Sequence, residues 1–452
     1  MSCSAASSPT SVSANKRLGE PLVALAALFF NHPLCVGRVS RILPERPDPN
    51  YAPGGTVAPT NEPKGRRAIA GPLVLFLAAT AALVSANSAY APDFRGFWHA
   101  THDLGGIRFT AQAIVDQGLM TVFFLVVGLA LKRELLHGAL RHPRTMVLPL
   151  AAALGGMILP ALIYHAFNPG GPTVAGWGVP MSTDIAFAVG ALTLLGRRVP
   201  RNLLIFLLAL AIVDDLGAIL VIAIYYTRDF HLTALLGAFL VLATLIVLNR
   251  RAVRGFGPYA LLAIVLWLAL WRAGINPPLA GFLLAAAFPA SSPARDTTVS
   301  PEHVSVRLER RLSPYVNFAV LPLFALANAG LTFRLADITR SPPVLLGVLL
   351  GLLLGKFCGV GGVSWLAVRL RWAHLPTGVG LRHVLGAAWL SGIGFTMALF
   401  VNTLAFAPGP ERAASKLAIL IASPLAAVLG IVWLWRARPR GPLTSDAPAP
   451  PA

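Results

Sequence analysis

Charged residues are scarce in this chain, and long apolar runs take their place. Only 12% of the 452 residues are charged and 56% are apolar, whereas a soluble domain usually carries about a quarter charged residues. Acidic residues are rarer than basic ones, with 18 Asp and Glu against 37 Lys and Arg. This composition excludes a single water-soluble core and predicts a membrane protein whose length comes from repeated spans.

The chain also lacks the motifs of enzymes and metalloproteins. Its three cysteines (Cys3, Cys35 and Cys358) fit no metal-ligand or redox spacing, and no nucleophile elbow or metal motif occurs. We therefore expect no enzyme and no resident cofactor. The formal charge of +19 does not indicate a nucleic-acid partner, because the basic residues lie mostly in alternate loops between apolar runs, as topology signals do.

Twelve apolar segments follow one another and predict an all-α polytopic membrane protein with about 12 transmembrane helices in the lipid bilayer. The eighth segment is short and carries Pro277-Pro278, so we expect it to span only in part. The segments are about 69–88, 112–136, 146–167, 176–196, 202–226, 232–249, 256–272, 275–290, 314–333, 343–368, 382–406 and 415–436.

The two ends of the chain differ from the transmembrane domain, which we place at 68–438. Residues 1–67 are rich in Ser, Pro, Asn and Arg and are expected to form a disordered cytoplasmic extension. A translation start that is assigned too early is the alternative. Residues 439–452 form a Pro-rich cytoplasmic tail. The bias of Lys and Arg toward alternate loops places both termini in the cytoplasm.

Few charges lie deep inside the apolar segments. Asp214 and Asp215 are adjacent in the middle of the fifth segment, Asp184 lies in the fourth, and Lys356 is the deep lysine of the tenth. Asp116, near the start of the second segment, is expected to be interfacial. Intramembrane ionisable residues are costly and are functional by default. A buried Asp–Lys pair that only joins two helices is the alternative, but it leaves the second adjacent acid unexplained.

The adjacency of Asp214 and Asp215 has a chemical consequence. Neighbouring helical residues point about 100° apart, so both carboxyls cannot face one partner. We expect one of them to meet Lys356 and the other to line a water-filled approach. Burial and mutual repulsion favour protonation of at least one carboxyl. A carboxyl tuned in this way holds either a proton or a hard cation, and exchange follows from that exclusion.

Two segments are expected to be interrupted. In the fourth segment, Pro180 removes a backbone donor and two preceding glycines loosen the chain. In the eleventh segment, Gly392 and Gly394 flank a single isoleucine. Glycines that serve only close helix packing are the alternative.

The positions of the interruptions suggest internal repeats. A broken span exposes helix ends that need counter-charges, and Asp184 and Lys356 are suitable for that purpose. Segments three to five and ten to twelve form two triplets with interrupted middle members. This pattern predicts two inverted three-helix repeats, with broken helices 4 and 11, around a site at the membrane midplane.

Several long strings, in order, resemble the NhaA family of bacterial sodium/proton antiporters. Inverted repeats are a known feature of this family, so their prediction is not independent of the resemblance. The resemblance covers about Arg67 to Arg438. Its strings include LMTVFFLVVGLALKREL at 119–135, STDIAFAVGALTLLGRRVP at 182–200, ALAIVDDLGAI at 209–219, LPLFALANAG at 321–330, LLLGKFCG at 352–359 and GIGFTMALF at 392–400.

The resemblance implies a role for each deep polar residue. Asp215 is implied to be the principal carboxylate that exchanges Na⁺ or Li⁺ for protons, with Asp214 and Thr183 at the same cation site. Asp184 is implied to balance helix-end charge. Lys356 is implied either to balance the opposite helix ends or to carry a proton with Asp214. These two alternatives stay open.

The resemblance also implies a physiological function. The family expels cytoplasmic Na⁺ at the expense of inward proton flow across the bacterial cytoplasmic membrane, which serves sodium and pH homeostasis, and its members are often homodimers. We predict electrogenic exchange, because one Na⁺ against the protons of two carboxyls moves net charge.

Three positions depart from the family pattern. Ala130 and Ala175 stand where well-known members carry acids, and Asn276 stands where they often carry a histidine. The family associates these positions with its pH response, and an Asn cannot gain charge between pH 5 and 8 as a His can. We predict an altered pH profile with exchange retained. Glu309 matches a family acid, so some pH-linked charge remains.

Two other transport functions stay open. A sodium-coupled solute carrier would need further solute-binding groups near the breaks, where mainly small residues and hydroxyls occur. A cation channel commonly builds its pore from several subunits, whereas these acids lie in one unsymmetrical chain. The choice among Na⁺, Li⁺ and K⁺ is also open, because oxygen ligands suit all three.

Overall fold

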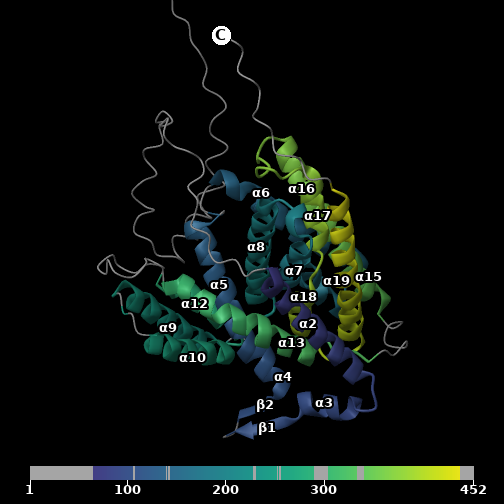
Figure 1. The fold of residues 1–452 in the computed structure, drawn as a ribbon. Coiled ribbons are helices and arrows are strands. Elements are labelled where there is room, and N and C mark those ends of the chain that lie inside the picture. The colour runs from purple at the N-terminus through teal and green to yellow at the C-terminus, as the bar shows by residue number, and fades with distance from the viewer. Residues whose placement is uncertain are drawn as a thin grey trace, which may run out of the picture. The chain divides into compact units, whose positions relative to one another are not determined.

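Helices make up most of the part of the chain that the structure describes (Figure 1). The computed structural model describes residues 65–437, apart from 105–106, 139, 141–142, 228–230, 252, 254–255, 290–303 and 333–340. The predicted extension therefore lies outside the described residues except for its last three, where the first described helix already begins, and the predicted tail at 439–452 lies wholly outside them.

The helices follow the order of the apolar segments, because a chain in hydrocarbon must satisfy its backbone hydrogen bonds internally. Their bounds, with π-helical and 3-10 turns labelled η, are α2 Gly65–Ala86, α3 Ala91–His99, α4 Ala111–Ala113, η1 Ile114–Leu119, α5 Met120–His137, α6 Pro143–Phe167, η3 Pro172–Met181, α7 Ile185–Leu194, η4 Gly196–Arg198, α8 Arg201–Tyr225, α9 Leu232–Arg250, α10 Phe256–Arg272, α11 Leu279–Ala287, α12 Val304–Tyr315, η5 Val316–Val320, α13 Leu321–Asn328, α15 Pro342–Leu350, η6 Gly351–Gly355, α16 Lys356–Arg369, α17 Leu381–Leu390, α18 Phe395–Ala405 and α19 Pro410–Arg436.

The described helices confirm a polytopic membrane protein that is almost entirely α-helical. Eight of them are long and apolar enough to cross a membrane, or nine if the bent pair α17–α18 counts as one span. The eighth apolar segment forms only the nine-residue helix α11, too short for a complete span. The count of 12 spans stays a prediction.

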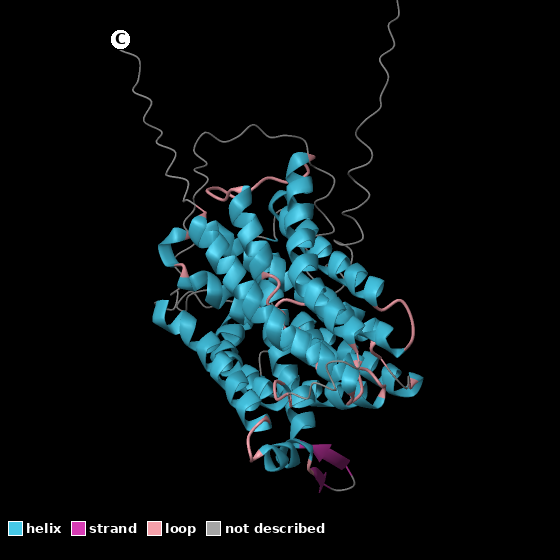
Figure 2. Cartoon of the chain, turned by 90° about the vertical axis from the view of Figure 1, so that its right-hand side faces the viewer, coloured by secondary structure: helices cyan, strands magenta, loops and turns pink. Residues whose placement is uncertain are grey.

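A small β-hairpin departs from the all-α prediction. Strands β1 Thr101–Leu104 and β2 Ile107–Thr110 pair antiparallel, with Thr101 opposite Thr110 and Leu104 opposite Ile107. The hairpin and α3 lie at one end of the helices, at the bottom of Figure 1, and the magenta strands of the hairpin are again at the bottom of the side view in Figure 2. Its strands lie between apolar segments, where the backbone is not forced into a helix, and four residues are too few for a clear alternating pattern.

Small residues bring α6 and α16 into direct backbone contact. A Cβ atom added at Gly155 would lie 2.3 Å from the Gly359 carbonyl oxygen, and one added at Gly359 would lie 2.2 Å from the Gly155 carbonyl oxygen. Such close approach is the usual way for membrane helices to pack. It fixes the N-terminal end of α16, where Lys356 begins the helix, against α6.

Both predicted breaks are present, and they cross each other. In the fourth segment, η3 ends at Met181, the next residues are extended, and α7 begins at Ile185. In the eleventh segment, α17 and α18 are bent by 47° around residues 391–394. The backbone N–H of Asp184 donates to the carbonyl oxygen of Ile393 at 2.6 Å, so one break is tied to the other. The relation of the two helix triplets as inverted repeats stays a prediction.

Candidate functional site

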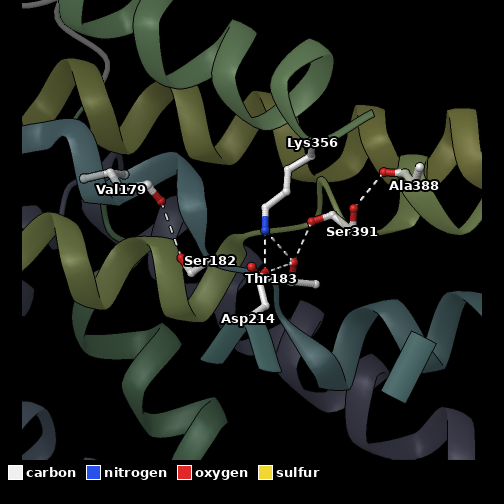
Figure 3. A network of polar contacts seen from close by, with 7 residues as sticks. All are labelled: Val179, Ser182, Thr183, Asp214, Lys356, Ala388 and Ser391. Atoms are coloured by element: carbon white, nitrogen blue, oxygen red, sulfur yellow. Dashed lines mark hydrogen bonds and ion pairs between the residues drawn. The ribbon is translucent and has the colours of Figure 1, made fainter. Parts of the chain in front are cut away.

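The crossing of the two breaks holds the one deep lysine that the sequence singles out. Lys356 follows the π-helical turn η6, a feature that is frequent at functional sites. Its ammonium forms an ion pair with Asp214 Oδ2 of α8 and donates to Thr183 Oγ1 at 3.1 Å. All three side chains are at most 1% exposed. Figure 3 shows Lys356 reaching toward Asp214 and Thr183 at the break.

Thr183 connects this ion pair to the second break. Its hydroxyl lies 2.6 Å from Asp214 Oδ2 and 2.9 Å from the carbonyl oxygen of Ser391 (Figure 3). A hydroxyl has one proton to donate, so Thr183 donates to one of these two acceptors at a time. The hydrogen bond can therefore move from the carboxylate to the backbone when the charge on Asp214 changes.

Asp215 is buried without a partner. Its side chain is fully buried, and neither carboxylate oxygen has a hydrogen-bond partner among the described residues. Oδ1 of Asp214 is likewise buried and unpartnered. A bare carboxylate in such a place is very costly unless it is neutralised. Three carboxylate oxygens at the centre of the protein are thus left for a proton or a cation.

Asp184 accepts hydrogen bonds from donors at the N-terminal ends of two half-helices. Its Oδ1 accepts the backbone N–H of Phe187 at 3.1 Å and caps α7. Its Oδ2 accepts both the hydroxyl of Thr396 and the backbone N–H of Thr396 at 3.0 Å, at the start of α18. A negative charge is favourable at the positive N-terminal ends of helices. The charge-balancing role of Asp184 stays a prediction, and these hydrogen bonds are the contacts through which it would act.

The residues expected at the breaks pack around the same crossing. Pro180 is buried in the 3-10 turn η3, so the first half of the fourth segment is not α-helical. A Cβ at Gly392 would lie 2.5 Å from the carbonyl oxygen of Leu352, and one at Gly394 would lie 2.8 Å from Leu352 Cδ2. The two glycines therefore allow η6, which leads into Lys356, to approach the second break.

The structure brings most of the predicted site residues together and corrects one expectation. Asp214, Thr183 and Lys356 are in contact, and Asp184 lies next to Thr183 in the same break. The contacts of Lys356 among the described residues are with Asp214 and Thr183, not with helix-end carbonyls. The second acid was expected to line a water-filled approach, but Asp215 has no exposure. Packing around α8 buries its whole central face, which the sequence pattern does not show.

Comparison with known proteins identifies the family. A family profile described as Na⁺/H⁺ antiporter 1 matches residues 65–434. The chain is 45% identical over 431 residues to the Na⁺/H⁺ antiporter NhaA of Acidithiobacillus ferrooxidans, covering 85% of this chain and 98% of the relative. The chain belongs to the NhaA family.

Other NhaA relatives match along nearly their whole length. The chain is 46% identical over 376 residues to Na⁺/H⁺ antiporter NhaA 2 of Pseudomonas syringae, covering 82% of this chain and 94% of the relative. It is 43% identical over 426 residues to the Na⁺/H⁺ antiporter NhaA of Syntrophobacter fumaroxidans, covering 83% and 90%. The resemblance found in the sequence is thereby confirmed.

The three positions that are expected to depart from the family pattern lie away from the crossing. Ala130 is on α5, and Ala175 is in η3, where its carbonyl oxygen accepts the Tyr226 hydroxyl at 2.6 Å. Asn276 precedes α11 and is buried, and its side-chain nitrogen has no partner among the described residues. None of the three contacts the Asp214–Lys356 pair in the described structure.

Lys132 is a buried cation that sequence analysis does not single out. It is 1% exposed, and its ammonium donates to the carbonyl oxygens of Ala286 at 2.9 Å, Ala285 at 3.3 Å and Phe288. These carbonyls end α11, so Lys132 caps the negative end of that short helix. Lys132 lies inside the apolar segment 112–136, and this position could have indicated a buried cation. It lies near the end of that segment, however, where a lysine side chain usually reaches the membrane interface.

Glu309 lies in a separate cluster of charges with Arg133 and Glu134. Glu309 Oε1 lies 3.4 Å from the guanidinium of Arg133, while Oε2 is buried with no partner among the described residues. Burial raises the pKa of Glu309 above its ordinary value of 4.5. The charge of Arg133 opposes this rise in pKa, and that of Glu134 adds to it. Protonation of Glu309 therefore favours the folded state.

The Glu309→Gln variant is expected to become more stable than the wild type as pH rises. The stabilising effect of protonated Glu309 is complete below its ordinary pKa and is lost as pH rises through its raised pKa. Glutamine keeps the neutral shape at every pH. The midpoint of thermal unfolding is measured on both purified proteins from pH 5 to 8. Over this rise in pH, the midpoint of the wild type should fall by a few degrees more than that of Glu309→Gln. Parallel curves for the two proteins would contradict the shift in the pKa of Glu309.

Proposed function

We propose that this NhaA member exchanges cytoplasmic Na⁺ or Li⁺ for external H⁺ at Asp215 and Asp214. The names of its relatives as Na⁺/H⁺ antiporters support the reaction. The observation that carries the proposal is the Asp215 carboxylate, which is fully buried and unpartnered next to an intact Asp214–Lys356 ion pair.

The unpartnered oxygens explain why the two ions exclude each other. Protonation makes Asp215 neutral and removes the cost of its burial. A small hard cation also neutralises the carboxylate, because it binds oxygen ligands. The oxygens that could bind it are those of Asp215, Oδ1 of Asp214 and the Thr183 hydroxyl. The same pocket binds either Na⁺ or H⁺, so binding of Na⁺ displaces the proton. The cation is the substrate, and no group of three His, Cys, Asp or Glu side chains that could hold a metal occurs among the described residues.

The ion pair offers a second proton to the cycle. If Na⁺ draws Asp214 away from Lys356, the ammonium is left buried without its counter-charge and favours release of its proton. One Na⁺ would then replace two protons, one from Asp215 and one from the Asp214–Lys356 pair. Such an exchange moves net charge and is electrogenic, with Lys356 acting as a proton carrier paired with Asp214.

The setting of the site is part of the proposal. Twelve spans, two inverted repeats and a cytoplasmic location for both termini would place the crossed breaks at the midplane of a bacterial cytoplasmic membrane. The Lys and Arg bias of the loops and the bacterial relatives support this arrangement. A homodimer and an altered pH profile stay predictions. Sodium-coupled solute uptake is less favoured, because the contacts at the crossing are ionic and hydroxyl groups that already pair with one another.

Competition between Na⁺ and H⁺ tests the proposed function. Everted membrane vesicles that contain the chain are given Na⁺ at fixed ionic strength between pH 6.5 and 8.5, and proton release is followed with a fluorescent dye. The Na⁺ concentration for half-maximal release should fall as pH rises, by up to about tenfold per pH unit for each bound proton that competes with Na⁺. A half-saturating Na⁺ concentration that ignores pH, or a response that requires an organic solute, would refute exchange at one shared pocket.

A further inference from the structure

A second polar region lies at the end of the helices that carries the β-hairpin. A cavity of about 560 Å³ is lined there by Asp116 of η1, Asn276 and Arg412 of α19, among others. Thr110, the last residue of β2, is among its lining residues. The charge bias of the loops assigns this end to the outside. In the proposed exchanger, the cavity therefore faces the medium that receives Na⁺.

One carboxylate in this cavity is set against fixed positive charge. Asp116 is the only acid among the described residues that line it, and its Oδ1 accepts the Asn328 amide at 2.6 Å. Arg412 lines the same cavity, so opposite charges from η1 and α19 share this site. Lys416, one turn along α19, adds a second positive charge and is held by the Gly330 carbonyl at 3.0 Å.

The second arginine of the cavity serves as an internal comparison. Arg272 also lines the cavity, but it is exposed at the end of α10. Arg412 is less exposed than Arg272, so water and salt screen its charge less. Arg272→Gln therefore removes an equal but more strongly screened charge from the same cavity.

We propose that Arg412 is a tethered cation that keeps external Na⁺ from binding at Asp116 and so weakens re-entry of Na⁺ from the outer face. A carboxylate in a narrow cavity concentrates cations, which would favour return of the exported ion. The guanidinium supplies that counter-charge in advance. Because arginine stays charged at every physiological pH, this protection does not depend on external acidity. Arg412 thus makes the apparent Na⁺ affinity of the outer face lower than it would otherwise be, from a position away from the Asp215 site.

This inference rests on the proposed function and on its orientation, and the two faces of the membrane allow both to be tested separately. Right-side-out vesicles give the external Na⁺ concentration for half-maximal Na⁺-driven proton efflux, from the internal pH. Everted vesicles give the same quantity for the cytoplasmic face. Choline chloride keeps the ionic strength near about 0.15 M in every assay, because screening would otherwise change with the Na⁺ concentration.

The Arg412→Gln variant should lower the half-saturating external Na⁺ concentration by about three- to tenfold, the scale of one nearby unit charge in a partly hydrated site. The cytoplasmic value should stay within about twofold of wild type, since Arg412 does not contact the crossing. Arg412→Lys should keep the wild-type value. Arg272→Gln, which removes an equal charge from the same cavity, should have little effect.

A double variant shows whether the effect acts through Asp116. In Arg412→Gln/Asp116→Asn, the half-saturating external Na⁺ concentration should return toward the wild-type value, because the carboxylate that attracts Na⁺ is gone. The inference is overturned if Arg412→Gln leaves the external value unchanged while exchange persists, or shifts both faces equally. Absence of exchange by the wild type on both faces would instead remove the proposed function itself.

Discussion

Asp215→Asn is expected to abolish Na⁺/H⁺ exchange while leaving the folded protein at least as stable as the wild type. Asparagine has nearly the same shape but holds neither a titratable proton nor a charge for Na⁺. In the exchanger, bound Na⁺ and the Asp215 carboxylate form a buried pair of charges. Loss of one charge from such a pair costs about 3–5 kcal/mol, which corresponds to a fall in Na⁺ affinity of more than about 100-fold. Exchange in everted vesicles should therefore fall below detection.

The stability half of this prediction separates function from folding. Neither Asp215 oxygen has a partner among the described residues, so Asn breaks no hydrogen bond there. It also removes the cost of a buried, unneutralised carboxylate. Thermal unfolding of purified Asp215→Asn should thus occur at or above the wild-type midpoint, with no response to Na⁺. A variant that still exchanges Na⁺, or that loses activity only because it unfolds, would contradict the assignment of Asp215.

Asp184→Asn is the matched control for this experiment. Asp184 is as deeply buried as Asp215, but its two oxygens accept hydrogen bonds at the starts of α7 and α18. Asn keeps one oxygen acceptor and loses the other along with the charge. The main effect should be a lower unfolding midpoint. Opposite effects of the two Asp→Asn changes on stability would show that burial alone does not define the exchange site.

The deep charges could be predicted because hydrocarbon makes them rare. Asp214, Asp215 and Lys356 stand out in apolar runs, and the contact of one Asp with Lys356 followed from the need to neutralise both charges. The apolar pattern alone did not decide which Asp pairs with Lys356, since the rotation of α8 is set by packing against other helices; only the family resemblance implied Asp214. The complete burial of Asp215 depends on the same packing.

Local chemistry predicted the breaks better than their conformations. Pro180 cannot donate a backbone hydrogen bond, and Gly392 and Gly394 flank a single isoleucine, so both interruptions could be predicted from the sequence. The 3-10 form of η3 and the hydrogen bond between Asp184 and Ile393 arise only when the two segments cross. The juxtaposition of Asp116 and Arg412 was not predictable either, because residues so far apart in the sequence meet only through the helix arrangement.

Breaking the Asp214–Lys356 ion pair should destabilise the protein far more than removing both partners. Lys356→Met leaves Asp214 buried with only the Thr183 hydroxyl, and Asp214→Asn leaves the ammonium unpaired. Each single change should cost about 3–5 kcal/mol of folding stability. The double variant Asp214→Asn/Lys356→Met buries no charge at this place, so its cost should be well below the sum of the two. Unfolding midpoints of the four proteins give the coupling, and additive effects would mean that the pair does not form.

The single variant Lys356→Met decides between the two roles implied for Lys356. It keeps the carboxyls of Asp215 and Asp214, each of which can still release a proton, but it lacks the ammonium. If Lys356 carries the second proton, the wild type should respond to a membrane potential set by K⁺ and valinomycin, and Lys356→Met should not. If Lys356 serves only charge balance, the second proton comes from Asp214, and Lys356→Met should keep the voltage response of the wild type. The charge moved per Na⁺ therefore reports which groups release protons, independently of how much stability the ion pair supplies.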